Sequence, residues 1–373
     1  MLQRDQLVAW LNNHAYPVWS LQGIDAANGG FVELLDQHGT GMVKPRRARV
    51  QPRQIYSFAM AKQFGWRGDI NGIVRRGVDY FTKNYRREDG LYRTLCDTEG
   101  RPLDDRAFLY DQAFALLSLA HASSVLNARA EFEPQALALR EVMEQQLRTQ
   151  EKGFISSDFH SETRESNPHM HLLEACLAWS RVGTDSGWTA LAEDLTDLAM
   201  NKFIQPNGAL KEFFTDDWQP ASGISGRIVE PGHQFEWAWL LLQCNRKDAQ
   251  RRRAAALKLI SIGETHGVRN GVAINALLDD FSVHDASARF WPQTERIKAA
   301  ALAGQMTGDD QYWMMAINAV QGLMRYLDTP VKGLWLDVIT PDGKLIDAPS
   351  PASSFYHLVA AIAQLDEGVK TLR

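Results

Sequence analysis

The sequence predicts an all-α fold, an (α/α)6 barrel of twelve helices that forms a single domain over residues 1–373. Three observations predict it. Apolar residues recur three and four apart in twelve segments, no sustained strand pattern occurs, and a short glycine-led apolar piece returns about every sixty residues. A period this long, repeated six times, is typical of a closed or stacked helical array.

The helices are expected to alternate between buried and solvent-facing members of a pair. Residues 235–242 are apolar nearly all round, which predicts a buried helix, whereas residues 249–266 carry the charged run 251–253 and should face water. Neither end of the chain has the polar face that caps an open solenoid, which favours a closed ring. The twelve segments are residues 4–20, 50–64, 69–85, 110–125, 132–148, 167–182, 187–203, 232–245, 249–266, 291–306, 309–327 and 351–367.

The glycine-led pieces precede every second helix, and by subtraction they lie 60, 63, 55, 63 and 62 residues apart. The helix that follows usually opens with proline, whose missing N–H would be unpaired in a first turn anyway. These short hairpin-like loops should gather at one end of the barrel, where the buried helices start. The pieces begin at Gly30, Gly90, Gly153, Gly208, Gly271 and Gly333.

Six helix N-termini that converge at one end bring free N–H groups and partial positive charge to that end. A pocket for a polar ligand is therefore expected there. His233 and Glu236 are the strongest candidates within it, because they lie three apart just after Pro231 and share one helix face. A single His-x-x-Glu motif more often belongs to a core helix whose histidine is simply hydrogen-bonded. The prediction therefore depends on the other repeats.

Two further histidines, His171 and His357, fall within two turns of the same predicted end in different repeats. Charged groups are rarely buried without reason, so this convergence predicts a catalytic site with His233, His357 and Glu236 as its reactive groups. His169 and His171 are two apart and diverge on a helix, so no metal site is predicted. The predicted substrate-binding residues are Arg49, Tyr110, Asn167, His171, Arg227, Trp291 and Glu295.

The totals exclude several other classes of protein. A net charge of −5 and a pI near 6.1 give no nucleic-acid or membrane signature. No signal peptide or membrane span is expected, and three distant cysteines indicate free thiols in a reducing compartment. We therefore expect a cytoplasmic protein, as a monomer or homodimer, that acts on a small molecule.

Histidines on opposite walls of a pocket suit proton removal and return at carbon, because an imidazole offers base and acid forms near neutral pH. Arginine and protonated histidine can stabilise an enediolate oxygen. No phosphate loop or nicotinamide fingerprint occurs in the sequence, so no cofactor is predicted. Sugar ring opening followed by proton transfer next to a carbonyl fits these residues.

Two other functions suit the same architecture. A glycoside hydrolase needs two carboxylates about the scissile bond, which Asp111, Glu236 and Glu295 would supply, but it leaves three inward histidines without a task. A non-catalytic sugar-binding barrel needs aromatic platforms, for which Trp237, Trp291 and Tyr110 are available, but no acid/base set.

At these residues the chain resembles the N-acylglucosamine 2-epimerase family, which includes aldose–ketose isomerases and cellobiose 2-epimerases. The matching pieces span nearly the whole chain, and their order and spacing together are specific. They are Arg49-Val50-Gln51-Pro52-Arg53-Gln54, Asn167-Pro168-His169-Met170-His171, Glu230-Pro231-Gly232-His233-Gln234-Phe235-Glu236-Trp237, Trp291-Pro292-Gln293-Thr294-Glu295 and Phe355-Tyr356-His357.

The resemblance implies an (α/α)6 barrel without a redox cofactor and an acid/base pair formed by His233 and His357. It also implies pocket positions for Arg49, Asn167, His171, Glu236 and Glu295.

Residues 110–114 resemble the members that isomerise free mannose. The sequence thus predicts an isomerase of the D-mannose to D-fructose type, with D-lyxose to D-xylulose as a related pair. A sugar 2-epimerase of the mannose/glucose, cellobiose or N-acylglucosamine type is the alternative.

In this hypothesis His357 shuttles a proton between C2 and C1, His233 is oriented by Glu236, and Arg49 holds the enediolate oxygen. Ser353 stands where some isomerases carry a larger amide, and Arg46, Arg47 and Arg53 leave room for an anionic substituent on the sugar.

Overall fold

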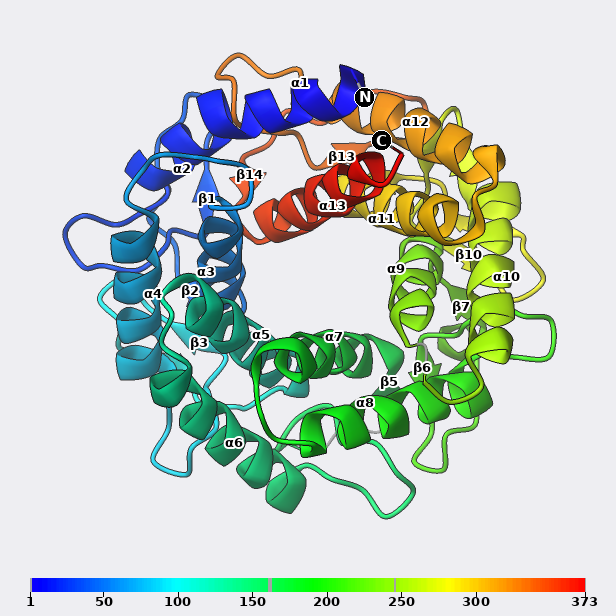
Figure 1. Cartoon of the computed structure of the whole chain (residues 1–373), viewed down its shortest axis with the longest axis horizontal. Coiled ribbons are helices and arrows are strands. Elements are labelled where there is room, and N and C mark those ends of the chain that lie inside the picture. Colours follow the sequence, from blue (N-terminus) through cyan, green and yellow to red (C-terminus); the bar gives the residue numbers. More distant parts are fainter. Residues whose placement is uncertain (1, 160–162, 245, 373) are drawn as a thin grey trace.

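The computed structural model describes residues 2–159, 163–244 and 246–372, which form a closed ring of two concentric helical layers (Figure 1). The predicted (α/α)6 barrel is confirmed. The inner layer consists of α3 (Val50–Met60), α5 (Leu109–Val125), α7 (Ser166–Val182), α9 (Pro231–Gln243), α11 (Phe290–Thr307) and α13 (Ser353–Lys370). The outer layer consists of α1 (Leu2–Trp10) with α2 (Tyr16–Leu21), α4 (Ile70–Tyr85), α6 (Arg129–Gln146), α8 (Gly187–Leu198), α10 (Ala249–Gly267) and α12 (Asp310–Met324).

Three outer helices include turns of another helical type. A π-helical turn, Leu11–Ala15, joins α1 to α2, and a second, Ala199–Phe203, extends α8. The 3-10 turn Arg325–Leu327 extends α12, and another, Ser225–Arg227, lies in the loop before α9. None of the helices in the described part of the chain is long and apolar enough to cross a membrane.

Burial separates the two layers as the sequence predicted. Every residue of α9 is buried except Trp239 and Gln243, whereas α10 buries one face only. Within the charged run of α10, Arg251 and Arg253 are exposed, but Arg252 turns inward. Its guanidinium lies 2.7 Å from Glu193 on α8, so this arginine ties two neighbouring outer helices together.

The first and last repeats close the ring directly. Strand β1 pairs antiparallel with β14, which places Leu34 opposite Pro351. The indole N–H of Trp19 donates to the carbonyl of Gly333 at 3.1 Å, and Trp19 stacks on Trp335 with ring centroids 5.0 Å apart. An open solenoid would leave these two ends far apart, so the contacts establish closure.

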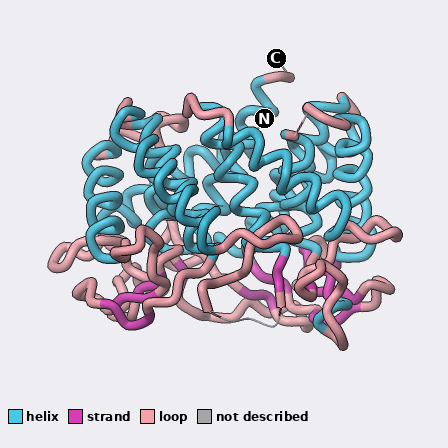
Figure 2. Tube along the Cα trace, turned by 90° about the horizontal axis from the view of Figure 1, so that it is seen from below, coloured by secondary structure: helices cyan, strands magenta, loops and turns pink. Residues whose placement is uncertain are grey.

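Short strands and loops gather at one end of the barrel (Figure 2). They pair into two- and three-stranded antiparallel sheets, consistent with the predicted hairpin-like loops. The strands are β1 (Leu34–Leu35), β2 (Arg46–Arg47), β3 (Leu95–Cys96), β4 (Pro102–Asp104), β5 (Arg164–Glu165), β6 (Phe213–Phe214), β7 (Ile228–Val229), β8 (Val268–Arg269), β9 (Val272–Ala273), β10 (Ala276–Leu278), β11 (Val283–Asp285), β12 (Ala288–Arg289), β13 (Val338–Ile339) and β14 (Ser350–Pro351).

A repeated hydrogen-bond clamp joins each glycine-led piece to the inner helix that follows, or, in the last repeat, to strand β14 just before that helix. The six leading glycines have φ between +71° and +101°, which L side chains adopt rarely. Just after Gly208, the N–H of Leu210 donates to Gln234 Oε1, and Gln234 Nε2 donates back to the Leu210 carbonyl, both at 2.9 Å. The other clamps join Gln51 to Phe31, Gln112 to Tyr92, His169 to Phe154, Gln293 to Ala273 and Ser350 to Trp335.

Candidate active site

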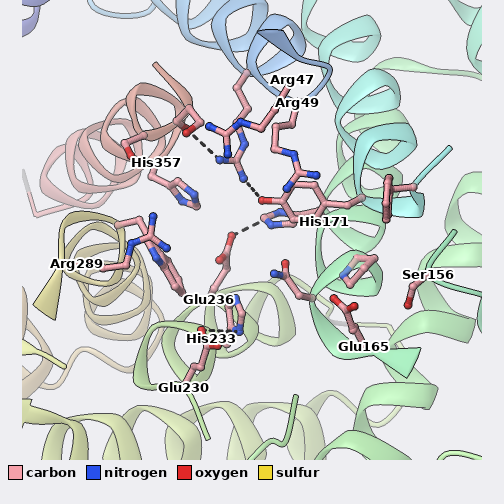
Figure 3. Close-up of a pocket in the computed structure, with 18 residues that line it drawn as sticks. Arg47, Arg49, Ser156, Glu165, His171, Glu230, His233, Glu236, Arg289 and His357 are labelled. Atoms are coloured by element: carbon pink, nitrogen blue, oxygen red, sulfur yellow. Dashed lines mark hydrogen bonds and ion pairs between the residues drawn. The ribbon is translucent and has the colours of Figure 1, made fainter. Parts of the chain in front are cut away.

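A cavity of about 440 Å³ opens at the loop end of the barrel, and all six inner helices contribute to its wall (Figure 3). Most of the predicted site residues meet there. The cavity is lined by Arg47, Arg49, Arg53, Phe108, Tyr110, Ser156, Glu165, Asn167, Pro168, His171, Glu230, His233, Glu236, Arg289, Trp291, Ser353, Ser354 and His357.

The two predicted acid/base histidines share this cavity. The ring centroid of Trp291 lies 5.0 Å from that of His233 and 5.7 Å from that of His357, so one indole packs beside both imidazoles. His169, which was expected to diverge from His171, does not line the cavity. Its Nε2 accepts from Phe154 N–H at 2.9 Å and its Nδ1 donates to the Glu165 carbonyl at 2.8 Å, so it has a structural role.

His233 is held by two carboxylates, neither of which is Glu236. Its Nδ1 lies 2.9 Å from Glu212 Oε2 and 3.4 Å from Glu230 Oε2. Burial alone would lower the pKa of His233, but the Glu212 and Glu230 charges outweigh it and raise that pKa to about 10. The residue is therefore an imidazolium near neutral pH. The hypothesis that Glu236 orients His233 is wrong, because Glu236 lies almost one turn deeper and faces α7.

His357 is bonded through the same ring nitrogen but carries no charge. Its Nδ1 donates to Glu295 Oε1 at 2.7 Å, which leaves Nε2 with its lone pair. Burial, followed by the charges of Arg53 and Lys298, lowers the pKa of His357 well below its ordinary value. Glu295 itself does not line the cavity. It lies behind His357 and is paired with Lys298 at 2.7 Å.

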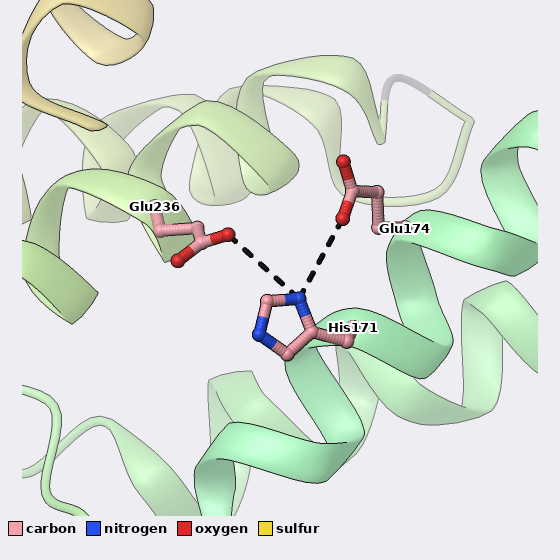
Figure 4. A group of neighbouring side chains, drawn as sticks. All are labelled: His171, Glu174 and Glu236. Carbon is pink, nitrogen blue, oxygen red and sulfur yellow. Dashed lines mark ion pairs between the residues drawn. The ribbon is translucent and has the colours of Figure 1, made fainter. Parts of the chain in front are cut away.

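Glu236 belongs to a group deeper in the barrel (Figure 4). His171 Nδ1 lies 3.6 Å from Glu174 Oε2 and 3.8 Å from Glu236 Oε1. Burial and the nearby Glu295 charge raise the pKa of Glu236 above its usual value. The donor atoms suit a metal ion. However, the Lys298 ammonium lies 3.9 Å from Glu236 and would repel a cation there, so we do not assign these residues as metal ligands.

The arginines of the first repeat occupy different depths. Arg49 Nε lies 3.3 Å from Asp111, and its guanidinium lies 4.5 Å from the Tyr110 ring. Arg53 is 5% exposed, donates to the Tyr110 hydroxyl, and donates to the Ser353 carbonyl at 3.1 Å. Arg53, which the sequence suggested only as room for an anionic substituent, is thus the arginine next to the helix that carries His357.

Two of the remaining arginines lie outside the cavity. Arg227, predicted to bind substrate, pairs at 2.9 Å with both Asp279 and Asp280 on the β10–β11 hairpin and is absent from the cavity wall. The reason is that the 3-10 turn ending at Arg227 turns this side chain toward the neighbouring repeat. Arg46 is buried against Asp25, so it offers nothing to an anion.

Glu212 was missed by the sequence reasoning, although the repeat contains a signal for it. In each repeat the clamp holds one residue of the glycine-led piece. The residue two positions after it in the sequence is polar in all six repeats. In the structure these side chains stand behind the cavity wall or form it. Glu33 pairs with Arg47 and Asp337 with Arg289, for example. The six are Glu33, Thr94, Ser156, Glu212, Asn275 and Asp337.

A neutral imidazole and an imidazolium in one polar cavity, with buried guanidinium groups beside them, form an acid/base site suited to a polyhydroxylated carbonyl compound. The fold and site thus define a sugar isomerase or epimerase. The chain belongs to the N-acylglucosamine 2-epimerase family, whose sequence profile matches residues 29–361.

Relatives over the full length agree with this assignment. The chain is 43% identical to a mannose-6-phosphate isomerase of Rhizobium meliloti, with 100% of this chain and 98% of the relative covered. It is 24% identical to a D-mannose isomerase of Marinomonas mediterranea, with 92% of each covered. Among solved structures, a D-mannose isomerase superposes with a TM-score of 0.88 over 98% of this chain and 97% of that one, at 20% identity.

Proposed function

We propose that the protein is an aldose–ketose isomerase that interconverts D-mannose and D-fructose, and D-lyxose and D-xylulose, through a cis-enediol. The main support for this proposal is that two imidazoles, one neutral and one protonated, line the same cavity. The names of the full-length relatives support the mannose-type substrate.

The reaction begins with ring opening, in which the imidazolium of His233 donates its proton to the ring oxygen as the C1–O5 bond breaks. The neutral His233 then takes the proton of the anomeric hydroxyl as the C1=O1 bond forms, which restores the imidazolium. His357 Nε2 then removes the proton from C2, while the Arg53 and Arg49 guanidinium groups stabilise the negative charge that develops on O1. The hydroxyl proton moves from O2 to O1 through the enediol, and His357 returns its proton to C1. Every proton taken is returned, so the ketose is an isomer of the aldose and no oxidant is consumed.

A 2-epimerase is the second candidate, and a specific observation favours it. The His233 imidazolium faces the same cavity as His357, so it can return a proton to the opposite face of C2. The two reactions share the enediol and differ only in the carbon that is reprotonated.

A phosphate on C6 would extend the substrate class, as the name of the 43% identical relative indicates. Arg47 and Arg289 support it, because they lie on the cavity wall with side chains 45% and 49% exposed. Each has a carboxylate partner, Glu33 or Asp337, so a phosphate would bind to arginines that are already oriented.

The test is incubation with D-mannose, and separately with D-mannose 6-phosphate, in D2O, followed by NMR of the products. A ketose with deuterium at C1 is the expected result, because the proton on His357 exchanges with the solvent while the enediol is bound. Deuterium at C2 of a glucose-type product would replace the isomerase by the epimerase. Absence of turnover with both sugars and with D-lyxose would overturn the proposed function.

A further inference from the structure

Lys298 is a buried cation that does not reach the cavity. It lies on α11 one turn after Glu295, and its side chain is 0% exposed. The ammonium is 2.7 Å from Glu295 Oε2, 3.9 Å from Glu236 Oε1 and 4.0 Å from the centroid of the Trp239 ring. A buried ammonium is strongly unfavourable unless it is paired, so the contact with Glu295 is what allows a lysine at this depth.

The surroundings of Lys298 come from five inner helices and from β12. They place three carboxylates, two imidazoles, a phenol and two guanidinium groups around the ammonium or its partners. These groups are Glu295 on α11, Glu236 on α9, Glu174 and His171 on α7, Tyr356 and His357 on α13, Arg53 on α3 and Arg289 on β12. Lys298 is thus a cation in direct contact with Glu295, the carboxylate that His357 bonds. Arg53 lowers the pKa of His357 from the cavity side.

His233 provides the natural comparison. It contacts Glu212 in the same way that His357 contacts Glu295, but the other described contact of Glu212 Oε2 is a hydroxyl, donated by Ser166 at 2.8 Å. The neighbouring lysine, Lys211, turns away to Asp279. In the described part of the chain no ammonium or guanidinium is paired with Glu212, and Arg289 acts on Glu230 only through its charge, so His233 holds a proton.

We propose that Lys298 is a positioning residue that keeps Glu295 ionised and His357 neutral, so that Nδ1–H is donated to Glu295 and Nε2 is free to act as the base. The inference rests on the proposed function, since it assigns the resting state of the base used there. Without the ammonium, the Glu295–His357 pair would retain one more proton up to a higher pH. On Nε2 that proton abolishes the base directly, and on Glu295 it removes the acceptor that orients the ring.

The experiment is the pH profile of kcat/KM for Lys298→Met, measured on the full chain with a sugar that the wild type converts. We expect the acid limb to move to higher pH, with a loss of at least about 10²-fold near pH 6 that narrows to about tenfold near pH 9. Lys298→Arg, if folded, should restore the limb. Trp239→Phe is the matched control, because it disturbs the packing against the ammonium without removing charge, and it should leave the limb in place.

An equal loss at every pH in Lys298→Met, or the same limb shift in Trp239→Phe, would show a merely structural role and overturn the inference. Should Lys298→Met fail to fold, ¹⁵N-histidine NMR of the wild type at pH 6 is decisive. His357 should appear neutral with its proton on Nδ1, and an imidazolium signal would refute the proposal. Wild-type turnover is measured first. Absence of turnover in the wild type would contradict the proposed function, whereas the pH profile of the variants tests the role of Lys298.

Discussion

His233 and His357 are bonded to a glutamate through the same ring nitrogen, yet one is an imidazolium and the other is neutral. Both are buried, and the Trp291 indole packs beside both of them. The difference lies beyond the first contact. His233 faces a second carboxylate, Glu230, whereas the carboxylate of His357 is matched by an ammonium and a guanidinium lies nearby.

The comparison teaches that a histidine–glutamate contact does not by itself determine the charge on the imidazole. Burial lowers the pKa of both rings, and the sum of the surrounding charges decides whether that effect is reversed. A histidine and a glutamate can therefore supply the acid at one position of a site and the base at another. Removing either half should stop the reaction.

The largest expected effect is the loss of either imidazole. His357→Ala and His233→Ala should each lower kcat by at least about 10²-fold, which is the scale of general acid–base catalysis. Turnover of mannose is the measurement, with circular dichroism to confirm folding. Near-wild-type turnover in either variant would discard the assignment of that residue.

The pH profile of the wild type should show the split between the two rings. Because the pKa of His357 is lowered, this residue remains available as the base below pH 6.5. Because the pKa of His233 is about 10, this residue remains available as the acid up to about pH 10. The kcat/KM profile should therefore be flat from below neutrality to about pH 9. A fall centred near pH 6.5 would show that His357 titrates as an ordinary imidazole.

Glu212→Gln should sharpen the comparison by changing one ring only. Loss of the nearer carboxylate lowers the His233 pKa, so the acid form disappears earlier as the pH rises, and the alkaline limb moves down by about one to three pH units. The acid limb, set by His357, should stay in place. Glu230→Gln is the graded control, because Glu230 is more distant at 3.4 Å and its loss should move the same limb less.

The clamps distinguish stability from catalysis. Gln234→Ala and Gln112→Ala each strip a buried N–H and a buried carbonyl of their partner, so each should lower the free energy of unfolding by roughly 2–5 kcal/mol. Gln234→Ala should lower kcat more than Gln112→Ala, because Leu210 stands two residues before Glu212, which contacts His233 directly. Denaturant unfolding and kinetics on both variants provide the test, and equal turnover in the two would argue against it.

The barrel could be predicted because the helical periodicity of apolar residues and the sixty-residue repeat can both be read directly along the chain. The sequence also located His171, His233 and His357, since the repeat places helix starts at one end. It could not assign partners. Glu236 was paired with His233 because the two lie three apart, but the true partner, Glu212, comes from the preceding loop. Contacts across the barrel, such as Lys298 with Glu236, depend on helix rotations that no spacing along one helix fixes.

The smallest expected effect tests that same limit of local reasoning. Arg227 was placed in the site because it stands shortly before His233, but its guanidinium is paired with two aspartates on a neighbouring hairpin. Arg227→Ala should therefore leave kcat and KM within about twofold of wild type, as expected for an exposed ion pair remote from the reacting atoms. Arg53→Ala is the contrasting variant, because Arg53 lies in the cavity wall beside α13 and should lose kcat. A large effect at Arg227 with none at Arg53 would mean that the substrate binds over the hairpin rather than between the two imidazoles.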